Sequence, residues 1–390
     1  MSLLEARPRA WPLWRATALG LSVWFALGLA CSSAAVVQEA PKVPAPRRAA
    51  VGKLVRAVEQ AGRASGLEEA IALLEQAVAE DPELWEARYN LGVLLARQGD
   101  LARATDQLEA AFELAPNAED VVCALGEVLR RRQESAAATR ILTGFVKTYP
   151  NAVEARRVLV LVLRESKQID LALEHARELL AREPGNPAAL AELALTHLAE
   201  GQVDVADLLI REAAKAPTRT AVVERAAGLI ALEQGEDAVA FAHFAKATEI
   251  DPTDTAAGLN TATVLLEAGV YDRAEKHFRT VLEAEPDSDA AKLGLAAALR
   301  GQGARDKPAP FHAAEALLRE ILSATPGHWE AAHNLAVLYA ESLDRPTDAT
   351  ASYEQFLRQA PAQHPSRERA QKWVQEHDPA KAAATPRAQQ

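Results

Sequence analysis

Nine prolines recur along this 390-residue chain at a nearly constant spacing. They stand at positions 82, 116, 150, 184, 217, 252, 286, 326 and 361, so the gaps are 34, 34, 34, 33, 35, 34, 40 and 35 residues. Between these prolines, apolar residues follow a helical period in two runs, which a polar turn such as Gln98-Gly99-Asp100 separates. The period predicts an all-α chain of repeated helix pairs, because one pair cannot bury its apolar face alone and stacks on its neighbours.

Small side chains recur where the two helices of each unit must approach closely. The twentieth place of all nine units is alanine: Ala70, Ala104, Ala138, Ala172, Ala206, Ala240, Ala274, Ala314 and Ala349. The eighth place is mostly glycine or alanine, as at Gly92 and Gly228. Larger residues such as Leu108 and Phe244 follow the alanine by four places, and we expect them to fill the space between the helices.

The period, the Leu91-Gly92 pair, the alanine column and the closing proline resemble the tetratricopeptide repeat (TPR) over residues 51–361. The resemblance implies a right-handed α-solenoid of about nine TPR helix pairs. Sel1-like repeats differ in length and in their glycine and aromatic pattern. Pentatricopeptide repeats bind RNA and are usually basic, whereas this chain has 43 Lys and Arg against 54 Asp and Glu, a net charge of −11. We therefore expect no nucleic-acid partner.

The chain is predicted to contain five segments. They are a lipoprotein signal peptide at 1–30, a Pro-rich tether at 31–50, a TPR solenoid of nine units at 51–363, a capping helix at 364–378 and a disordered tail at 379–390. A capping helix is expected because the last repeat would otherwise leave one face uncovered. The gap of 40 residues predicts a longer turn around residues 305–310 of the eighth unit.

The first thirty residues have the layout of a secretory signal. Three arginines precede the uncharged run 16–30, which is shorter than the roughly 20 residues that span a bilayer. Gly28-Leu29-Ala30-Cys31 resembles the bacterial lipobox at Ala30 and Cys31 and departs from it at the two preceding places. An ordinary signal-peptidase site and an uncleaved anchor are the alternatives. The resemblance implies that Cys31 becomes an N-terminus carrying acyl chains such as palmitate, and Ser32 favours the outer membrane.

Removal of residues 1–30 would take away three Arg and one Glu, leaving 40 basic and 53 acidic residues, a net charge of −13. The overall charge therefore predicts that acyl chains, rather than attraction to anionic lipid, hold the mature chain on a membrane.

Motifs of enzymes and metal sites are absent from the sequence. It contains no G-x-x-x-x-G-K-[ST], G-x-S-x-G, H-E-x-x-H or C-x-x-C pattern. His328 and His333 are five residues apart, which is unsuitable for two ligands on one helix face. Cys123 is interpreted as a small apolar filler. We expect no catalytic residues, no cofactor and no metal, and the repeats leave no stretch for a separate catalytic domain.

The inner surface of the solenoid is the predicted binding surface. By the resemblance, places two, five, nine and twelve of each first helix face it. The later units are predicted to form an apolar trough there, with Leu195, Leu229, Leu259, Thr263, Leu266, Leu293 and Val337. The earlier units are predicted to form a charged stretch, with Tyr89, Arg130, Arg157 and Arg164. The alternative is that close packing of neighbouring repeats buries these leucines.

Another kind of TPR surface clamps the C-terminal carboxylate of a partner with Lys or Arg and Asn at fixed places. Asn90, Asn260 and Asn334 stand in three separate units, and the basic residues expected in adjoining units are missing. The sequence therefore argues against such a clamp.

The length, Cys31 and the last unit, which begins HWEAAHNLAVLYAE, resemble the gliding-motility TPR lipoproteins. This resemblance implies a non-enzymatic, lipid-anchored scaffold of the outer membrane that faces the periplasm and binds envelope proteins. A pilotin or assembly factor for a secretin, pilus or outer-membrane protein complex is one alternative. A TPR subunit of a cell-wall enzyme complex is another.

Overall fold

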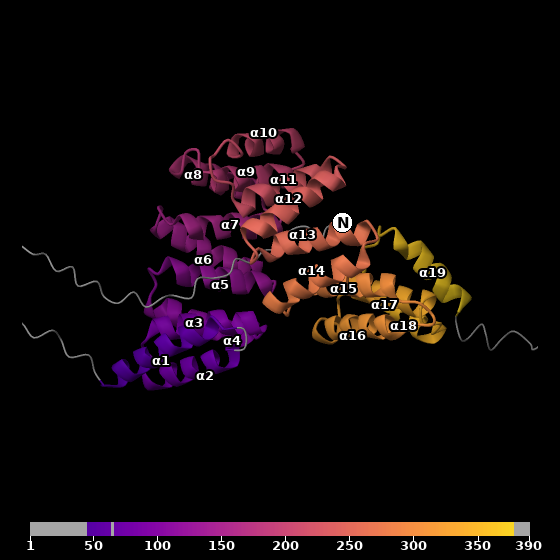
Figure 1. The fold of residues 1–390 in the computed structure, drawn as a ribbon, viewed down its shortest axis with the longest axis horizontal. Coiled ribbons are helices and arrows are strands. Elements are labelled where there is room, and N and C mark those ends of the chain that lie inside the picture. The colour runs from indigo at the N-terminus through magenta and orange to yellow at the C-terminus, as the bar shows by residue number, and fades with distance from the viewer. Residues whose placement is uncertain (1–44, 64–65, 378–390) are drawn as a thin grey trace, which may run out of the picture. The chain divides into compact units, whose positions relative to one another are not determined.

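The computed structural model describes residues 45–63 and 66–377, and within them it contains nineteen helices and no β-strand (Figure 1). The chain divides into two compact units at Glu200 and Gly201. The N-terminal unit contains α1 (Ala45–Ala61), α2 (Leu67–Glu80), α3 (Trp85–Gln98), α4 (Leu101–Leu114), α5 (Glu119–Arg131), α6 (Ser135–Thr148), α7 (Val153–Glu165), α8 (Ile169–Arg182) and α9 (Pro187–Ala199). The C-terminal unit contains α10 (Val203–Ala213), α11 (Ala221–Glu233), α12 (Asp237–Ile250), α13 (Thr255–Glu267), α14 (Tyr271–Ala284), α15 (Asp289–Gln302), α16 (Ala309–Ala324), α17 (Trp329–Glu341), α18 (Pro346–Gln359) and α19 (Ser366–Glu376).

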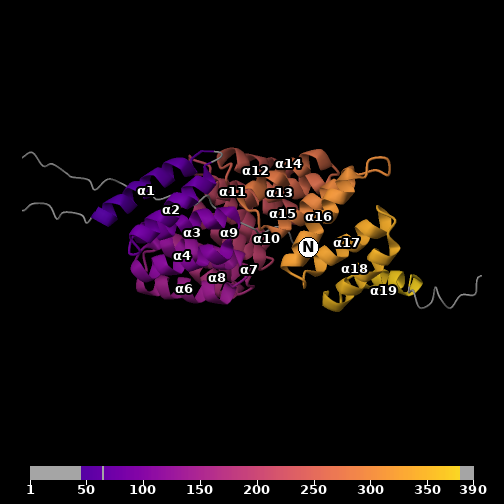
Figure 2. The same ribbon diagram turned by 90° about the horizontal axis from the view of Figure 1, so that it is seen from below.

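The predicted α-solenoid is confirmed. Helices α1 to α18 follow one another as nine pairs, and α19 occupies the place of the predicted capping helix. Within each unit, successive helices pack against each other, as α1 and α2 or α17 and α18 do in both views (Figures 1 and 2). The predicted signal peptide, Cys31 and the C-terminal tail lie outside the described residues.

The first helix begins at Ala45, whereas the sequence predicted a tether up to residue 50 and a solenoid from residue 51. Pro46 is the second residue of this helix. A proline is tolerated there because the N–H groups of the first helical turn have no partner within the helix. The proline-rich composition continues into the first turn of α1, so it does not show where the helix begins.

The alanine column is buried throughout, because all nine of its side chains have an exposed fraction of 0%. The glycines of the eighth place lie against the large residue of the second helix. A Cβ atom added to Gly92 would lie 2.6 Å from Leu108, and one added to Gly228 would lie 2.5 Å from the Phe244 ring. Glycine is required at these places because a methyl group would enter the volume of the neighbouring side chain.

The seventh unit accommodates its phenylalanine differently. Phe278 stands at the same place as Phe244, but the eighth place of its own unit is Ala262. Its ring instead lies against the following first helix, where a Cβ added to Gly294 would be 2.2 Å away. The ring therefore uses a glycine of the next unit.

The longer turn predicted in the eighth unit is confirmed. Residues 303–308 connect α15 to α16, and Ala304 and Lys307 form two backbone hydrogen bonds across this connection. Three of the six extra residues lie in this connection, and the other three lengthen α15 and α16, which have 14 and 16 residues where α13 and α14 have 13 and 14.

Candidate functional site

The charged stretch predicted in the N-terminal unit is neutralised by the chain itself. Arg130 on α5 contacts Glu127 at 2.6 Å and Glu165 on α7 at 3.1 Å. Arg164 on α7 donates to Glu192 on α9 at 3.2 Å, and both of these side chains are buried.

Arg157 pairs with Glu154 and, at 3.5 Å, with Glu183, while Tyr89 on α3 is buried. The arginines of the predicted charged stretch are therefore paired rather than open, and partner binding through them stays a prediction. Carboxylates of the same and the next repeat already contact these guanidinium groups.

The apolar residues predicted to form a trough are also not an exposed surface. Six of them, Leu195, Leu229, Leu259, Thr263, Leu293 and Val337, are at most 8% exposed. Leu259 and Leu293 belong to the hydrophobic core of the C-terminal unit, and Leu266 is half-buried against that core. The fifth and ninth places of these first helices are therefore buried, and the expectation that their side chains form an exposed trough is wrong. Partner binding through these residues stays a prediction.

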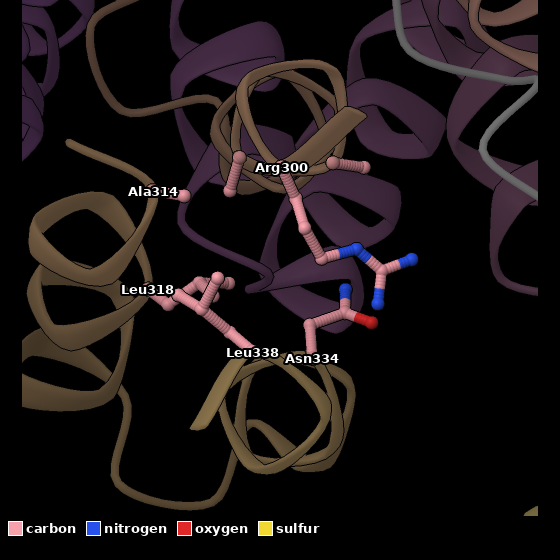
Figure 3. Close-up of a pocket in the computed structure, with 7 residues that line it drawn as sticks. Arg300, Ala314, Leu318, Asn334 and Leu338 are labelled. Carbon is pink, nitrogen blue, oxygen red and sulfur yellow. The ribbon is translucent and has the colours of Figure 1, made fainter. Parts of the chain in front are cut away.

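A pocket lies between α15, α16 and α17 of the C-terminal unit. Its lining is mostly small or apolar and consists of Ala296, Ala297, Arg300, Ala314, Leu318, Asn334 and Leu338. Figure 3 shows the Arg300 guanidinium and the Asn334 carboxamide turned to the same side of the pocket, away from Ala314 and Leu318. The cavity is small, about 20 Å³, which is enough for a water molecule or a methyl group.

The two polar residues of this pocket occupy the same repeat places as a buried ion pair of the N-terminal unit. Arg164 and Arg300 are each the twelfth residue of their first helix. Glu192 and Asn334 are each the sixth residue of the following first helix. In the N-terminal unit the protein thus supplies a carboxylate to the arginine, whereas in the C-terminal unit a neutral amide stands in that place.

Positive charge prevails around Arg300. Its nearest acid is Glu341, at 3.9 Å, and Glu341 also pairs with Arg369 of α19. Burial lowers the pKa of His333, the neighbour of Asn334, and the positive charges of Arg369 and Arg300 lower it further. Two arginines therefore share one carboxylate at the mouth of the pocket.

The three asparagines at the sixth place differ in access. Asn90 and Asn260 are fully buried; the Asn90 Oδ1 atom and both amide atoms of Asn260 have no hydrogen-bond partner. Asn334 is half-buried and lines the pocket. Of the three, Asn334 is the one that a ligand can reach.

The arrangement is suited to binding a carboxylate. A guanidinium group has five N–H donors in a fork that matches the two carboxylate oxygens, and a carboxamide adds a donor and an acceptor. The apolar floor accepts a small group only, since ligand pockets for cofactors measure roughly 300–1,000 Å³. Among residues 45–63 and 66–377, no group of three His, Cys, Asp or Glu could hold a metal ion.

Arg300 is a basic residue in the unit next to that of Asn334, which the sequence prediction did not count, and the absence of a clamp of that kind stays a prediction. The extra residues of the eighth unit place Arg300 and Asn334 farther apart in sequence than Arg164 and Glu192, although the repeat places agree. Alignment by repeat place, rather than by residue distance, is the signal that would have found the pair.

Two family models described as tetratricopeptide repeat match the chain. One matches residues 55–119 and 123–187 and the other matches residues 231–298, which together cover about half of the chain. The chain belongs to the tetratricopeptide repeat family. TPR proteins are generally non-catalytic scaffolds that bind protein partners. Membership of the gliding-motility lipoproteins stays a prediction.

Solved structures share this TPR fold at low sequence identity. A chain of the APC/C hetero-tetramer Cut9-Hcn1 is 16% identical with a TM-score of 0.54, and the match covers 80% of this chain and 59% of that one. The human IFIT1 dimer with PPP-AAAA is 17% identical with a TM-score of 0.54, and the match covers 86% of this chain and 83% of that one. These likenesses concern the fold alone. A search of curated protein sequences gives no match.

Within the part of the chain that the structure describes, no helix combines the length and the apolar character that crossing a membrane requires.

Proposed function

We propose that this TPR protein is a scaffold that binds a carboxylate-bearing segment of a partner protein at the Arg300–Asn334 pocket. One observation carries the proposal. The repeat place that holds Glu192 in the N-terminal unit holds Asn334 in the C-terminal unit. Where the protein has its own carboxylate, the arginine is buried and paired. Where the amide stands, the Arg300 side chain remains 42% exposed.

The partner segment presents an acidic side chain to Arg300, with a small apolar group beside it. The carboxylate accepts hydrogen bonds from Arg300, and the Asn334 amide binds the neighbouring peptide group. A small side chain such as alanine fills the apolar floor. Arg369 adds positive charge, which increases the rate of association with an acidic segment more than the affinity.

The setting of this scaffold is the cell envelope. Acylation at Cys31 would anchor it to the outer membrane, facing the periplasm, and its partners would be envelope proteins of a machine such as gliding motility. The lipobox-like sequence and the resemblance of the last unit support this setting. Cys31→Ala is expected to move the protein from the membrane fraction to the soluble periplasmic fraction, whereas retention in the membrane after a high-salt wash would contradict the anchor.

The pocket is tested with a variant in which the protein itself supplies a carboxylate to Arg300. Asn334→Glu is expected to pair with Arg300, as Glu192 pairs with Arg164, and to exclude the ligand while the helices stay folded. The purified chain is titrated by calorimetry with two peptides whose N- and C-termini are blocked. The peptides have the same sequence except at two positions, which are Glu in one peptide and Gln in the other. We expect the Glu peptide to bind the wild type roughly tenfold more tightly, a difference of about 1.4 kcal/mol, and Asn334→Glu to abolish this preference.

Gln371→Glu is the matched control, because it adds the same charge at an exposed place of α19. It is expected to keep the preference for the Glu peptide. Equal binding of both peptides by the wild type would refute the proposed site. An equal loss in Asn334→Glu and Gln371→Glu would show that only the overall charge matters and would also refute it.

A further inference from the structure

The first helix is basic in a chain that is acidic overall. Within α1 and the turn after it stand five basic residues, Arg47, Arg48, Lys53, Arg56 and Arg63, and one acidic residue, Glu59. The whole chain has 43 basic and 54 acidic residues. The positive charge of α1 is therefore local, and the net charge conceals it.

The basic residues are not spread evenly around α1. Ala50, Leu54, Ala57 and Ala61 form its buried stripe. The opposite stripe, three to four residues apart at each step, contains Arg48, Gly52, Val55, Arg56, Glu59 and Arg63. All six are exposed, so the stripe carries three arginines and one acidic residue, Glu59, and Val55 is 39% exposed. The stripe away from the core thus combines arginines with one apolar side chain.

Two of these arginines are not neutralised by the chain. Arg56 donates to the backbone oxygen of Gly52, and Arg63 donates to the side-chain oxygen of Gln60. Neither forms an ion pair within residues 45–63 and 66–377. By contrast, Lys53, at the edge of the buried stripe, pairs with Glu80 of α2. Within the described residues, Arg56 and Arg63 thus keep their charge available for a partner.

We infer that the outward stripe of α1 lies on the anionic surface of the bilayer. This inference rests on the anchoring at Cys31 in the proposed function. Only 13 residues separate Cys31 from Ala45, and an extended chain spans at most roughly 3.3–3.6 Å per residue. The start of α1 therefore lies within about 45–50 Å of an acyl anchor at Cys31.

The chemistry of the stripe fits lipid headgroups. Arginine forms forked hydrogen bonds with phosphate, and a basic helix near an anionic surface gains binding energy from each basic residue. An acyl anchor and a basic patch together form the two signals that give stable attachment. The occupant is thus a bilayer that contains anionic phospholipid, and α1 orients the anchored solenoid upon it.

The test is flotation with vesicles, using the chain from Ser32 so that neither the signal nor an acyl chain contributes. This form retains every described residue. We expect binding to phosphatidylglycerol-containing vesicles, weak binding to phosphatidylcholine vesicles, and loss of binding at high salt. Arg56→Glu with Arg63→Glu is expected to lower the affinity by about fivefold or more for each arginine.

The matched control is Arg358→Glu with Lys372→Glu, two exposed residues of α18 and α19 whose exchange changes the net charge equally. It is expected to keep vesicle binding. Absence of binding to anionic vesicles, or an equal loss in both double variants, would overturn the inference, and the first result would leave an acidic protein as the occupant. These outcomes are independent of Cys31→Ala fractionation and of the peptide titrations, so failure here is distinguishable from failure of the proposed function.

Discussion

Replacement of a single hydrogen atom by a methyl group is expected to have opposite effects at two helical glycines. At Gly228 on α11, the new Cβ would lie 2.5, 2.6 and 2.9 Å from three carbon atoms of the Phe244 ring. At Gly144 on α6, nothing lies within 4 Å of the new Cβ. Both glycines are inside helices, so the change in helix propensity is similar, and the difference between the variants measures packing alone.

The magnitude follows from the distances. Carbon atoms in contact normally stand about 3.5–4.0 Å apart, so the Phe244 ring must move by roughly 1 Å. Phe244 has no exposed surface, and overpacking of this kind costs about 1–3 kcal/mol. The gain in helix propensity offsets about 0.5–1 kcal/mol. Three contacts under 3 Å place the cost in the upper part of that range, about 2–3 kcal/mol. After the offset we expect Gly228→Ala to lower the free energy of unfolding by about 1–2 kcal/mol, and Gly144→Ala to raise it by about 0.5–1 kcal/mol.

Thermal unfolding followed by circular dichroism is the assay. In a unit of this size, 1 kcal/mol shifts Tm by about 2–4 °C, so Gly228→Ala is expected to lower Tm by about 2–8 °C. The double variant Gly228→Ala with Phe244→Leu is expected to be more stable than the sum of the single changes predicts, because the smaller side chain relieves the contact. A Gly228→Ala protein as stable as the wild type, or strictly additive effects, would refute the reasoning.

Two further predictions concern buried charge and pH. Glu192→Ala removes the carboxylate that contacts the buried Arg164, and we expect a loss of about 3–5 kcal/mol in urea unfolding, whereas Arg164→Met with Glu192→Leu should cost much less. Because burial lowers the pKa of His333 in the folded state, its contribution to stability is complete above the ordinary histidine pKa and is lost progressively as the pH falls from that value through the lowered folded pKa. The difference in Tm between pH 7.5 and pH 5.5 should therefore be smaller in His333→Leu, and an unchanged difference would contradict this.

The fold was predictable because its determinants repeat. A place occupied by alanine in nine units has one geometric meaning in all of them, and the full burial of Ala274 and its equivalents confirms that meaning. The large residues four places later were also assigned correctly, since Leu108 and Phe244 fill the space over Gly92 and Gly228.

The binding surface was less predictable because it depends on how individual side chains are shared between neighbouring repeats. Leu259 and Leu293 have the same hydrophobicity in a core and in an open trough, and their burial decides between the two. Arg164 has the same charge whether or not Glu192 stands beside it. The exchange of Glu192 for Asn334 is visible in the sequence, but its significance depends on the contact that the structure shows.

The Phe244 and Phe278 rings pack against glycines of different units, and this limits which repeats can be duplicated, deleted or moved. Phe244 needs the glycine of its own unit, whereas Phe278 needs Gly294 in the unit that follows. The seventh unit is consequently not a self-sufficient module: a copy of it placed before a repeat with a larger residue at that place would have no room for its aromatic ring. Duplication, deletion or grafting of repeats in this chain must therefore move the seventh and eighth units together.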